Sequence, residues 1–223
     1  MDFLGLIFPK KCVNCGRWGS YVCRDCEVGM WEEEQICPVC GRNSRYGLRH
    51  TYCKGEMEGL VCLWAYEGVT RKIITRAKYS GQFDVLEFLI SNFEFLNKLE
   101  MFKFLEFIEV RPKVVPVPLH PKRNRERGFN QSKVISLSLS RNFNLEVGDL
   151  LTRVKETKPQ AGRSRAERLE AMEGAFAINS KFSVPQNILL VDDVWTTGAT
   201  MRECVKTLRK GGVKKVWGWV LAR

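Results

Sequence analysis

The sequence lacks a long apolar run. No window approaches the roughly 18–20 consecutive apolar residues of a membrane-spanning helix, so we expect no membrane span. The first residues, MDFLGLIFPKKC, also lack the basic start and the small-residue cleavage site of a secretory signal, so we expect a cytoplasmic protein. With 44% apolar and 27% charged residues over 223 positions, the composition is that of a globular chain of one large or two smaller domains.

Acidic residues are scarce in one part of the chain. Residues 1–62 hold eight Lys/Arg and eight Asp/Glu, whereas residues 111–172 hold fourteen Lys/Arg against six Asp/Glu, within a total net charge of +11. Concentrated positive charge favours an anionic partner such as phosphate or nucleic acid. A solvated basic surface without a partner gives the same count, so charge alone does not identify the partner.

Cysteine is concentrated near the N-terminus. Seven of the nine cysteines lie within residues 12–53, as three Cys-x-x-Cys pairs and one His-x-x-Cys pair. A two-residue spacer lets one tight turn aim two ligands at one ion, and tetrahedral zinc needs two such turns. Because the cytosol keeps thiols reduced, structural zinc is favoured over disulfides. The eight predicted ligands are Cys12, Cys15, Cys23, Cys26, Cys37, Cys40, His50 and Cys53.

The order of these ligands predicts one or two zinc sites. Residues 12–26 and 37–53 look like an internal repeat, so we expect one site in each. Crossed pairing between the two units would use the same ligands. A four-ligand zinc site has no open position, so we assign it no catalytic role. About 50 residues bury little core, so zinc would supply much of the stability of this module, which we place at residues 1–57.

Residues 58–223 alternate expected strands with expected helices. The strands are expected at 58–66, 113–118, 150–153, 174–179, 187–191 and 213–222. The helices are expected at 70–81, 82–108 (one or two), 132–143 and 200–212. Two basic stretches, 119–132 and 154–170, are expected as loops. Alternating strands and helices predict an α/β fold with a mostly parallel sheet flanked by helices.

Two adjacent aspartates follow the apolar run at 188–191, in the stretch ILLVDDVWTTGAT. In open parallel sheets, ligands bind at the carboxyl ends of the strands, where Asp192 and Asp193 are expected. Carboxylates accept hydrogen bonds and suit sugar hydroxyls or a metal. The turn at 196–200 offers backbone N–H groups and hydroxyls at a helix N-terminus, which suits a phosphate. The two halves together fit a ribose 5-phosphate.

This stretch resembles the phosphoribosyl pyrophosphate (PRPP) motif of class I phosphoribosyltransferases. The resemblance implies that Asp192 and Asp193 bind the ribose 2- and 3-hydroxyls, and that Mg²⁺ accompanies PRPP. It implies that the 5-phosphate is held by Thr196, Thr197, Gly198, Ala199 and Thr200. It also implies a flexible basic loop, here with Lys158 and Arg163. Arg127 is the best candidate for a pyrophosphate contact, because a guanidinium binds phosphate oxygens bidentately, so Asp192, Asp193 and Arg127 are the catalytic candidates.

The segment VPVPLHPKRNRERGFNQS (115–132) is similar to the signature of the ComF competence proteins, which ends in RGFNQ. Segments 77–82 and 157–176 also resemble ComF sequences, so the resemblance covers essentially the whole chain. It implies a double zinc ribbon followed by a phosphoribosyltransferase domain, here residues 58–223. It further implies a link to natural competence, with single-stranded DNA and other competence proteins as partners. Lys78 is a candidate phosphate contact or an exposed lysine at a helix end.

The sequence leaves the reaction open. One alternative is an active phosphoribosyltransferase that transfers ribose 5-phosphate to an unidentified nitrogen acceptor. Another is a PRPP-sensing regulator without catalysis. No stretch is typical of a hood that recognises a base, so the sequence names no acceptor and does not decide whether the chain is an enzyme.

Overall fold

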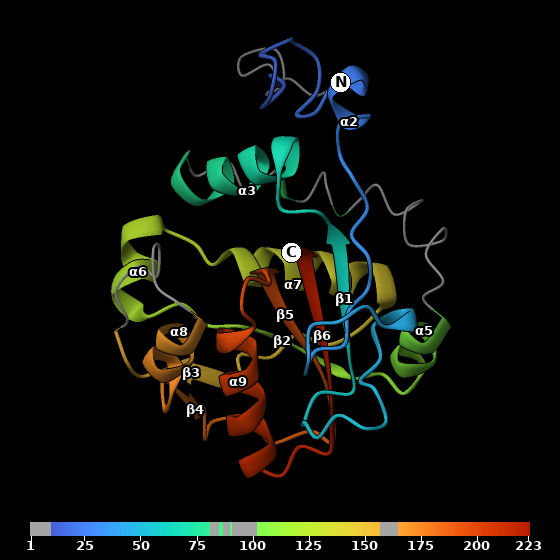
Figure 1. The fold of residues 1–223 in the computed structure, drawn as a ribbon. Helices are drawn as coiled ribbons and strands as arrows, with labels where there is room; N and C mark the ends of the chain where they lie inside the picture. The colour runs from blue at the N-terminus through green and yellow to red at the C-terminus, as the bar shows by residue number, and fades with distance from the viewer. Residues whose placement is uncertain (1–9, 81–84, 87–89, 91–101, 157–164) are drawn as a thin grey trace.

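A four-stranded sheet forms the centre of the computed structural model, which describes residues 10–80, 85–86, 90, 102–156 and 165–223 (Figure 1). The strand order is β1-β6-β5-β2, and all three pairings are parallel. The mostly parallel α/β sheet predicted from the sequence is therefore confirmed. Its strands are β1 (Gly59–Trp64), β2 (Lys113–Pro116), β5 (Asn187–Val194) and β6 (Lys215–Ala222).

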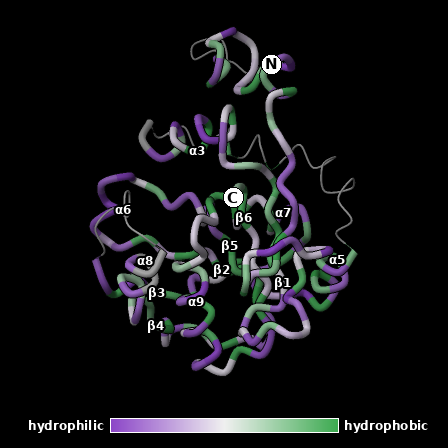
Figure 2. Tube along the Cα trace, in the orientation of Figure 1, coloured by the Kyte–Doolittle hydropathy of each residue, from purple (hydrophilic) through white to green (hydrophobic). Residues whose placement is uncertain are grey.

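Both faces of this sheet are buried, which explains why its strands are continuous apolar runs rather than alternating ones (Figure 2). Successive residues of a strand point to opposite faces. One face therefore belongs to a cluster that includes Val61, Leu189, Val191 and Trp219. The other face belongs to a second cluster that includes Leu60, Ile188, Leu190 and Val220.

Helices cover the two faces and the upper edge of the sheet in Figure 1. The first face is covered by α7 (Gln131–Phe143) and α5 (Phe102–Glu109), whose Phe104 ring lies 5.7 Å from that of Trp217. The second face is covered by α9 (Ala199–Lys210). Helix α3 (Gly68–Ser80) crosses above the carboxyl ends of the strands. Of the expected helical stretch 82–108, most lies outside the described residues.

A second, antiparallel pair of strands lies beside α9. It consists of β3 (Leu151–Arg153) and β4 (Phe176–Ile178), joined through α8 (Arg165–Met172). The expectation that 154–170 is entirely loop was wrong at its C-terminal part, because α8 begins at Arg165. Helix α8 packs on α9 and places Met172, which is 1% exposed, in the second apolar cluster. The helix sequence, RAERLEAM, has few large apolar residues, which gives too weak a pattern to predict this helix.

The basic stretch 119–132 also contains a helix that the sequence analysis missed. Helix α6 (Pro121–Arg127) has proline at its first position and a backbone N–H capped by His120, and it ends at Gly128, whose φ is 77°. All seven of its residues are exposed or half-buried. The helix therefore has no apolar stripe, and only its end residues indicated it.

Two zinc-ribbon units precede the sheet. The first ribbon, residues 12–26, contains α2 (Arg24–Glu27) and lies above α3 in Figure 1. The second ribbon, residues 37–53, contains a 3-10 turn (Arg45–Gly47) and lies close to β1. The boundary placed between residues 57 and 58 stays a prediction. Over the part of the chain that the structure describes, every helix is too short or too polar to cross a bilayer.

Candidate functional site

The two adjacent aspartates lie inside strand β5 rather than after it. The strand was expected to end at residue 191, but it continues to Val194, with Asp192 paired to Val220 and Val194 to Ala222 in the register with β6. The correction matters because successive side chains of a strand point to opposite sides. The two carboxylates therefore have different neighbours.

Asp192 is held by the beginning of helix α7. Its Oδ1 accepts a hydrogen bond from Ser132 Oγ and another from the Asp193 backbone N–H, both at 2.9 Å. Burial, followed by the nearby Asp193 charge, raises the pKa of Asp192 to about 7, against the opposing effect of these hydrogen bonds. Near neutral pH this carboxyl group is therefore poised between its protonated and charged forms.

Asp193 is paired with the end of helix α3. Its Oδ2 lies 2.7 Å from Lys78 Nζ, and the two side chains are only 13% and 21% exposed. Burial opposes the charge of Lys78, but the Asp193 carboxylate outweighs it and raises the pKa of the lysine. Lys78 is thus a largely buried partner of Asp193 and not an exposed lysine, while its contact with a phosphate stays a prediction. Nothing local in the sequence shows that a helix more than a hundred residues earlier ends beside Asp193.

The turn after β5 leads directly into helix α9. Gly198 has a φ of 73°, and a Cβ at this position would lie 2.2 Å from Cζ2 of Trp195, so only glycine fits. Ala199 donates its N–H to Thr197 Oγ1 at 3.3 Å, and Thr200 Oγ1 donates to Met172 Sδ at 3.5 Å. The first N–H groups of a helix have no partners within the helix and carry positive partial charge, so this turn can hold an anion.

The α6–α7 corner brings a second helix N-terminus to the carboxyl end of β2. Asn130 caps α7 and donates its side-chain N–H to the Val117 carbonyl at 3.0 Å, which fixes the start of α7 beside Asp192. Arg127 Nη1 donates to Gln131 Oε1 at 3.4 Å. The role of Arg127 as an anion contact stays a prediction, and Ser132, in the same segment, contacts Asp192. Sequence analysis assigned Ser132 no role.

The basic loop is described only at its base. Lys158 and Arg163, the two predicted loop contacts, lie outside the described residues. Before them, Lys155 Nζ donates to the Glu173 carbonyl at 2.7 Å, and Glu156 lies 2.9 Å from Lys122 Nζ of α6. The loop therefore starts in contact with the basic helix.

Arg153 is a cation near the site that sequence analysis did not single out. It is half-buried on β3, with its guanidinium 5.6 Å from the centroid of the Phe176 ring. Burial, followed by the charge of Arg123, lowers the pKa of Arg153, while the Asp192 carboxylate acts in the opposite direction. Its position at the start of the basic loop was the one sequence feature that pointed to it.

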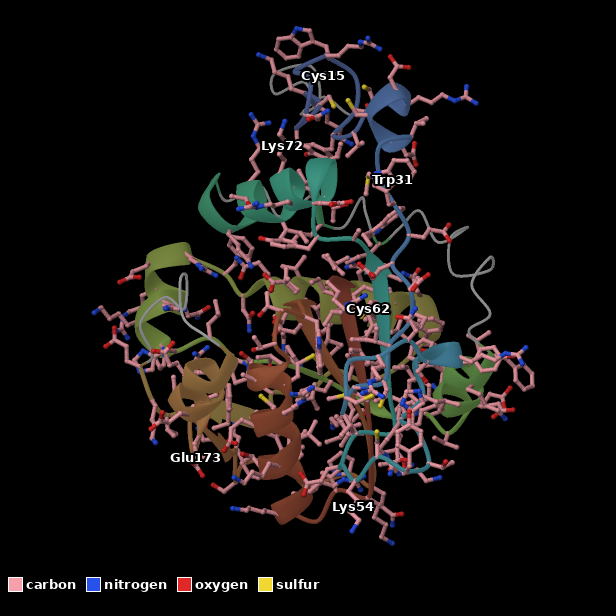
Figure 3. The ribbon with its side chains drawn as sticks, viewed as in Figure 1. Cys15, Trp31, Lys54, Cys62, Lys72 and Glu173 are labelled. Carbon is pink, nitrogen blue, oxygen red and sulfur yellow. The ribbon has the colours of Figure 1, made fainter. Side chains whose placement is uncertain are left out.

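The eight predicted zinc ligands come together in two groups of four. Within each group, the ligand atoms all lie within 4.8 Å of one another. The grouping follows the order of the chain, and Figure 3 shows sulfur atoms gathered around Cys15 at the top of the molecule. The groups are Cys12, Cys15, Cys23 and Cys26, and Cys37, Cys40, His50 and Cys53.

The chemistry of these donors fits zinc. Backbone hydrogen bonds, mainly from Cys15 and Cys23, outweigh burial and lower the pKa of Cys12 to about 6, which favours the thiolate that binds zinc. Burial and the neighbouring thiols raise the pKa of Cys53 to about 11, because several thiolates repel one another. A bound cation relieves that repulsion. Both groups therefore support structural zinc.

Comparison with known proteins gives the same picture. Residues 3–56 match a family model described as a double zinc ribbon domain. The chain is 30% identical over 228 residues to a protein of Haemophilus influenzae named competence protein F, which covers 97% of this chain and 98% of that protein.

Two further relatives extend the comparison. The chain is 31% identical over 218 residues to competence protein ComFC of Streptococcus pneumoniae, covering 97% of this chain and 82% of the relative. It is 27% identical over 231 residues to DNA utilization protein YhgH of Escherichia coli, covering 98% and 99%. The similarity thus spans the zinc ribbons and the sheet together.

Proposed function

The chain belongs to the ComF family of competence proteins, and on that premise we propose that it binds PRPP with Mg²⁺ at the carboxyl end of β5. One observation carries this proposal. Asp192 and Asp193 lie near the carboxyl end of the parallel strand β5, and the Gly198 turn at the N-terminus of α9 follows a few residues after the strand. Carboxylates for sugar hydroxyls and backbone N–H groups for a phosphate are thereby joined in one short segment.

The carboxylates keep acceptor capacity for a sugar. Among the contacts between described residues, Asp192 uses Oδ1 and Asp193 uses Oδ2, which leaves Asp192 Oδ2 and Asp193 Oδ1 for the ribose hydroxyls. The 5-phosphate would then lie on the turn at 196–200. We place Asp192 and Asp193 in the role of orienting the ribose.

The pyrophosphate end of the ligand requires positive charge. We assign this role to Arg127 and Arg153 and to the basic loop that carries Lys158 and Arg163. Mg²⁺ bound together with PRPP would supply positive charge that neutralises part of the leaving-group charge. The protein itself contributes positioning and a cationic surrounding.

Calorimetric titration with PRPP and Mg²⁺ tests the site. We expect wild-type binding in the micromolar range, weakened by about 1–2 kcal/mol in Asp192→Asn and in Asp193→Asn, because each loses a charged hydrogen-bond acceptor. Asp149→Asn is the matched control, since this exposed aspartate pairs with Lys133 on the surface. Unchanged affinity in both site variants contradicts the assignment. Pyrophosphate release over a panel of bases and amines then separates a transferase from a PRPP-binding protein.

Single-stranded DNA is the second ligand that we propose. The observation that favours it is α6, whose Lys122 and Arg125 are exposed on a helix in the most basic part of the chain. A relative named as a DNA utilization protein supports the same direction. Fluorescence anisotropy over a salt series should show affinity falling steeply with salt, and Lys122→Ala should reduce the salt slope by about one. An absence of binding at low salt would remove this proposal.

A further inference from the structure

One arginine side chain of helix α9 binds the second zinc ribbon through hydrogen bonds. Arg202, on the first turn of α9, donates from Nε and Nη2 to the Pro38 carbonyl at 3.1 and 3.0 Å. Its Nη2 also donates to the Val39 carbonyl at 3.1 Å. Pro38 and Val39 are the two spacer residues of the Cys37-x-x-Cys40 pair. The Arg202 guanidinium therefore forms hydrogen bonds to the backbone between the two zinc ligands Cys37 and Cys40.

The same arginine also supports the turn that we assign to the phosphate. Its guanidinium carbon lies 5.4 Å from the centroid of the Trp195 ring, within cation–π range. Trp195 is 4% exposed, and its ring fills the space against Gly198. The Arg202 N–H donates to the Gly198 carbonyl at 2.9 Å. A continuous series of contacts thus runs from the backbone between Cys37 and Cys40, through Arg202 and Trp195, to the Gly198 turn.

We propose that Arg202 is a positioning residue that couples the second zinc site to the phosphate turn. When Cys37 and Cys40 bind zinc, the carbonyls between them have fixed positions, and Arg202 holds Trp195 against the turn. When the metal leaves, the backbone between the two cysteines loosens, Arg202 loses its acceptors, and the turn loses its support. This inference rests on the proposed function, since it takes the 5-phosphate of PRPP as the ligand of the turn.

The chemistry of arginine suits this role. The guanidinium is planar and rigid, so its three hydrogen bonds to two adjacent carbonyls fix direction as well as distance. Its flat face is free to stack on an aromatic ring at the same time. A lysine at this position would carry the same charge but could not donate several hydrogen bonds in one fixed plane. Arg202→Lys should therefore retain only part of the coupling.

Helix α9 supplies a matched control. Arg209 lies two turns further along α9 and also binds a backbone carbonyl at the end of the N-terminal module. Its Nε and Nη2 donate to the Glu56 carbonyl at 2.9 and 2.6 Å. It lies at the opposite end of α9 from the Gly198 turn. Removing Arg209 therefore removes a comparable anchor while leaving the chain of contacts to the turn intact.

The first test measures PRPP affinity by calorimetry in zinc-loaded proteins. We expect Arg202→Met to weaken binding about tenfold, Arg202→Lys by less, and Arg209→Met by no more than about twofold. Cys40→Ser should weaken binding as much as Arg202→Met does, and the double variant should be no worse than either single one. Circular dichroism and thermal melts verify that each variant folds.

The second test starts from the wild-type protein. A coloured chelator competes with the protein for zinc until equilibrium is reached, with and without PRPP. By thermodynamic reciprocity, if zinc strengthens PRPP binding, PRPP must strengthen zinc binding. PRPP should therefore raise the zinc affinity of one of the two sites, identified as the second site by its absence in Cys40→Ser, and Arg202→Met should abolish this increase.

The outcomes separate this inference from the proposed function. If the wild-type protein does not bind PRPP, both are overturned. If it binds PRPP but Arg202→Met and Arg209→Met have equal affinities, or PRPP raises the zinc affinity of neither site, the coupling alone is overturned. If both arginine variants weaken binding equally, Arg202 is merely a structural anchor.

Discussion

The two zinc ribbons share a ligand spacing but are attached to the molecule in different ways. The first ribbon joins the apolar cluster on one face of the sheet through Val13 and Val22, and Val69 and Ile73 of α3 belong to the same cluster. Residues next to the second ribbon, including Met57, join the cluster on the opposite face. Arginines of α9 additionally bind its carbonyls and those of the segment that follows it.

This difference shows how one motif can serve two purposes. Apolar contact is not directional, so a ribbon docked through it can shift slightly at little cost in free energy. Hydrogen bonds from a rigid guanidinium fix an orientation. Among the described residues, the first ribbon is connected to the two aspartates across α3, about two turns of helix from Lys72 to Lys78. The second ribbon is connected to the Gly198 turn through Arg202 and Trp195.

The largest expected effect comes from removing one ligand of each ribbon. Cys12 and Cys37 are matched, since both are fully buried first ligands. Cys37→Ser should lower the free energy of unfolding by at least about 4 kcal/mol, and Cys12→Ser by about half as much. The reason is that Ile36 and Met57, which flank the second ribbon, are buried on the sheet. Urea unfolding measured by tryptophan fluorescence tests this, and equal losses contradict it.

A smaller effect is expected where α3 meets the sheet. Asp193→Asn leaves the half-buried Lys78 ammonium without its carboxylate and should cost about 3 kcal/mol. Adding Lys78→Met should restore most of that loss, because no unpaired charge is left. The exposed Lys133–Asp149 pair is the control, and Lys133→Met should cost no more than about 1 kcal/mol. If the losses in unfolding free energy of Asp193→Asn and Lys78→Met simply add in the double variant, the ion pair does not join α3 to the sheet.

The raised pKa of Asp192 should make the free energy of unfolding depend on pH. The folded chain keeps the Asp192 proton up to about pH 7, whereas an unfolded chain releases it near pH 4. Stability is therefore lost as the pH rises from about 4 to 7, and Asp192→Asn should recover on the order of 2 kcal/mol at pH 8 but nothing at pH 4. Urea unfolding across this pH range measures the difference. A gain that is the same at both pH values contradicts the raised pKa.

The smallest effect is expected at the polar contact of the first ribbon. Lys72 Nζ donates to Asn14 Oδ1 at 2.7 Å, and in Figure 3 the Lys72 side chain extends from α3 toward this ribbon. Because the contact is exposed, Lys72→Ala should change the unfolding free energy by less than about 0.5 kcal/mol. A loss above about 1 kcal/mol in thermal or urea unfolding would mean that the first ribbon also depends on a directional contact.

Much of this architecture could be predicted from the sequence. Periodicity indicated the parallel sheet, and cysteine spacing indicated the eight zinc ligands, because both depend on short-range patterns. The apolar run before Asp192 and Asp193 likewise indicated that they lie at the carboxyl end of a strand.

The partners of the site residues could not be predicted. Ser132 and Lys78 touch the aspartates through contacts between distant parts of the chain, which no local pattern records. Arg202 lay within the predicted helix 200–212, but its acceptors are backbone carbonyls, which carry no sequence signature. Helix α6 was not predicted, because an exposed helix has no periodic pattern of apolar residues.

The raised pKa of Asp192 has a consequence for the heat of ligand binding. At neutral pH about half of these carboxyl groups carry a proton, and a sugar hydroxyl that needs an acceptor selects the ionised half. On the proposed function, binding of a ribose hydroxyl to Asp192 would therefore release a fraction of a proton into the solvent. The buffer takes up that proton, so the measured enthalpy would differ between phosphate and Tris even if the affinity did not. The hydrogen bond from Ser132 opposes the effects of burial and of Asp193 on the pKa of Asp192, and so makes that fraction smaller.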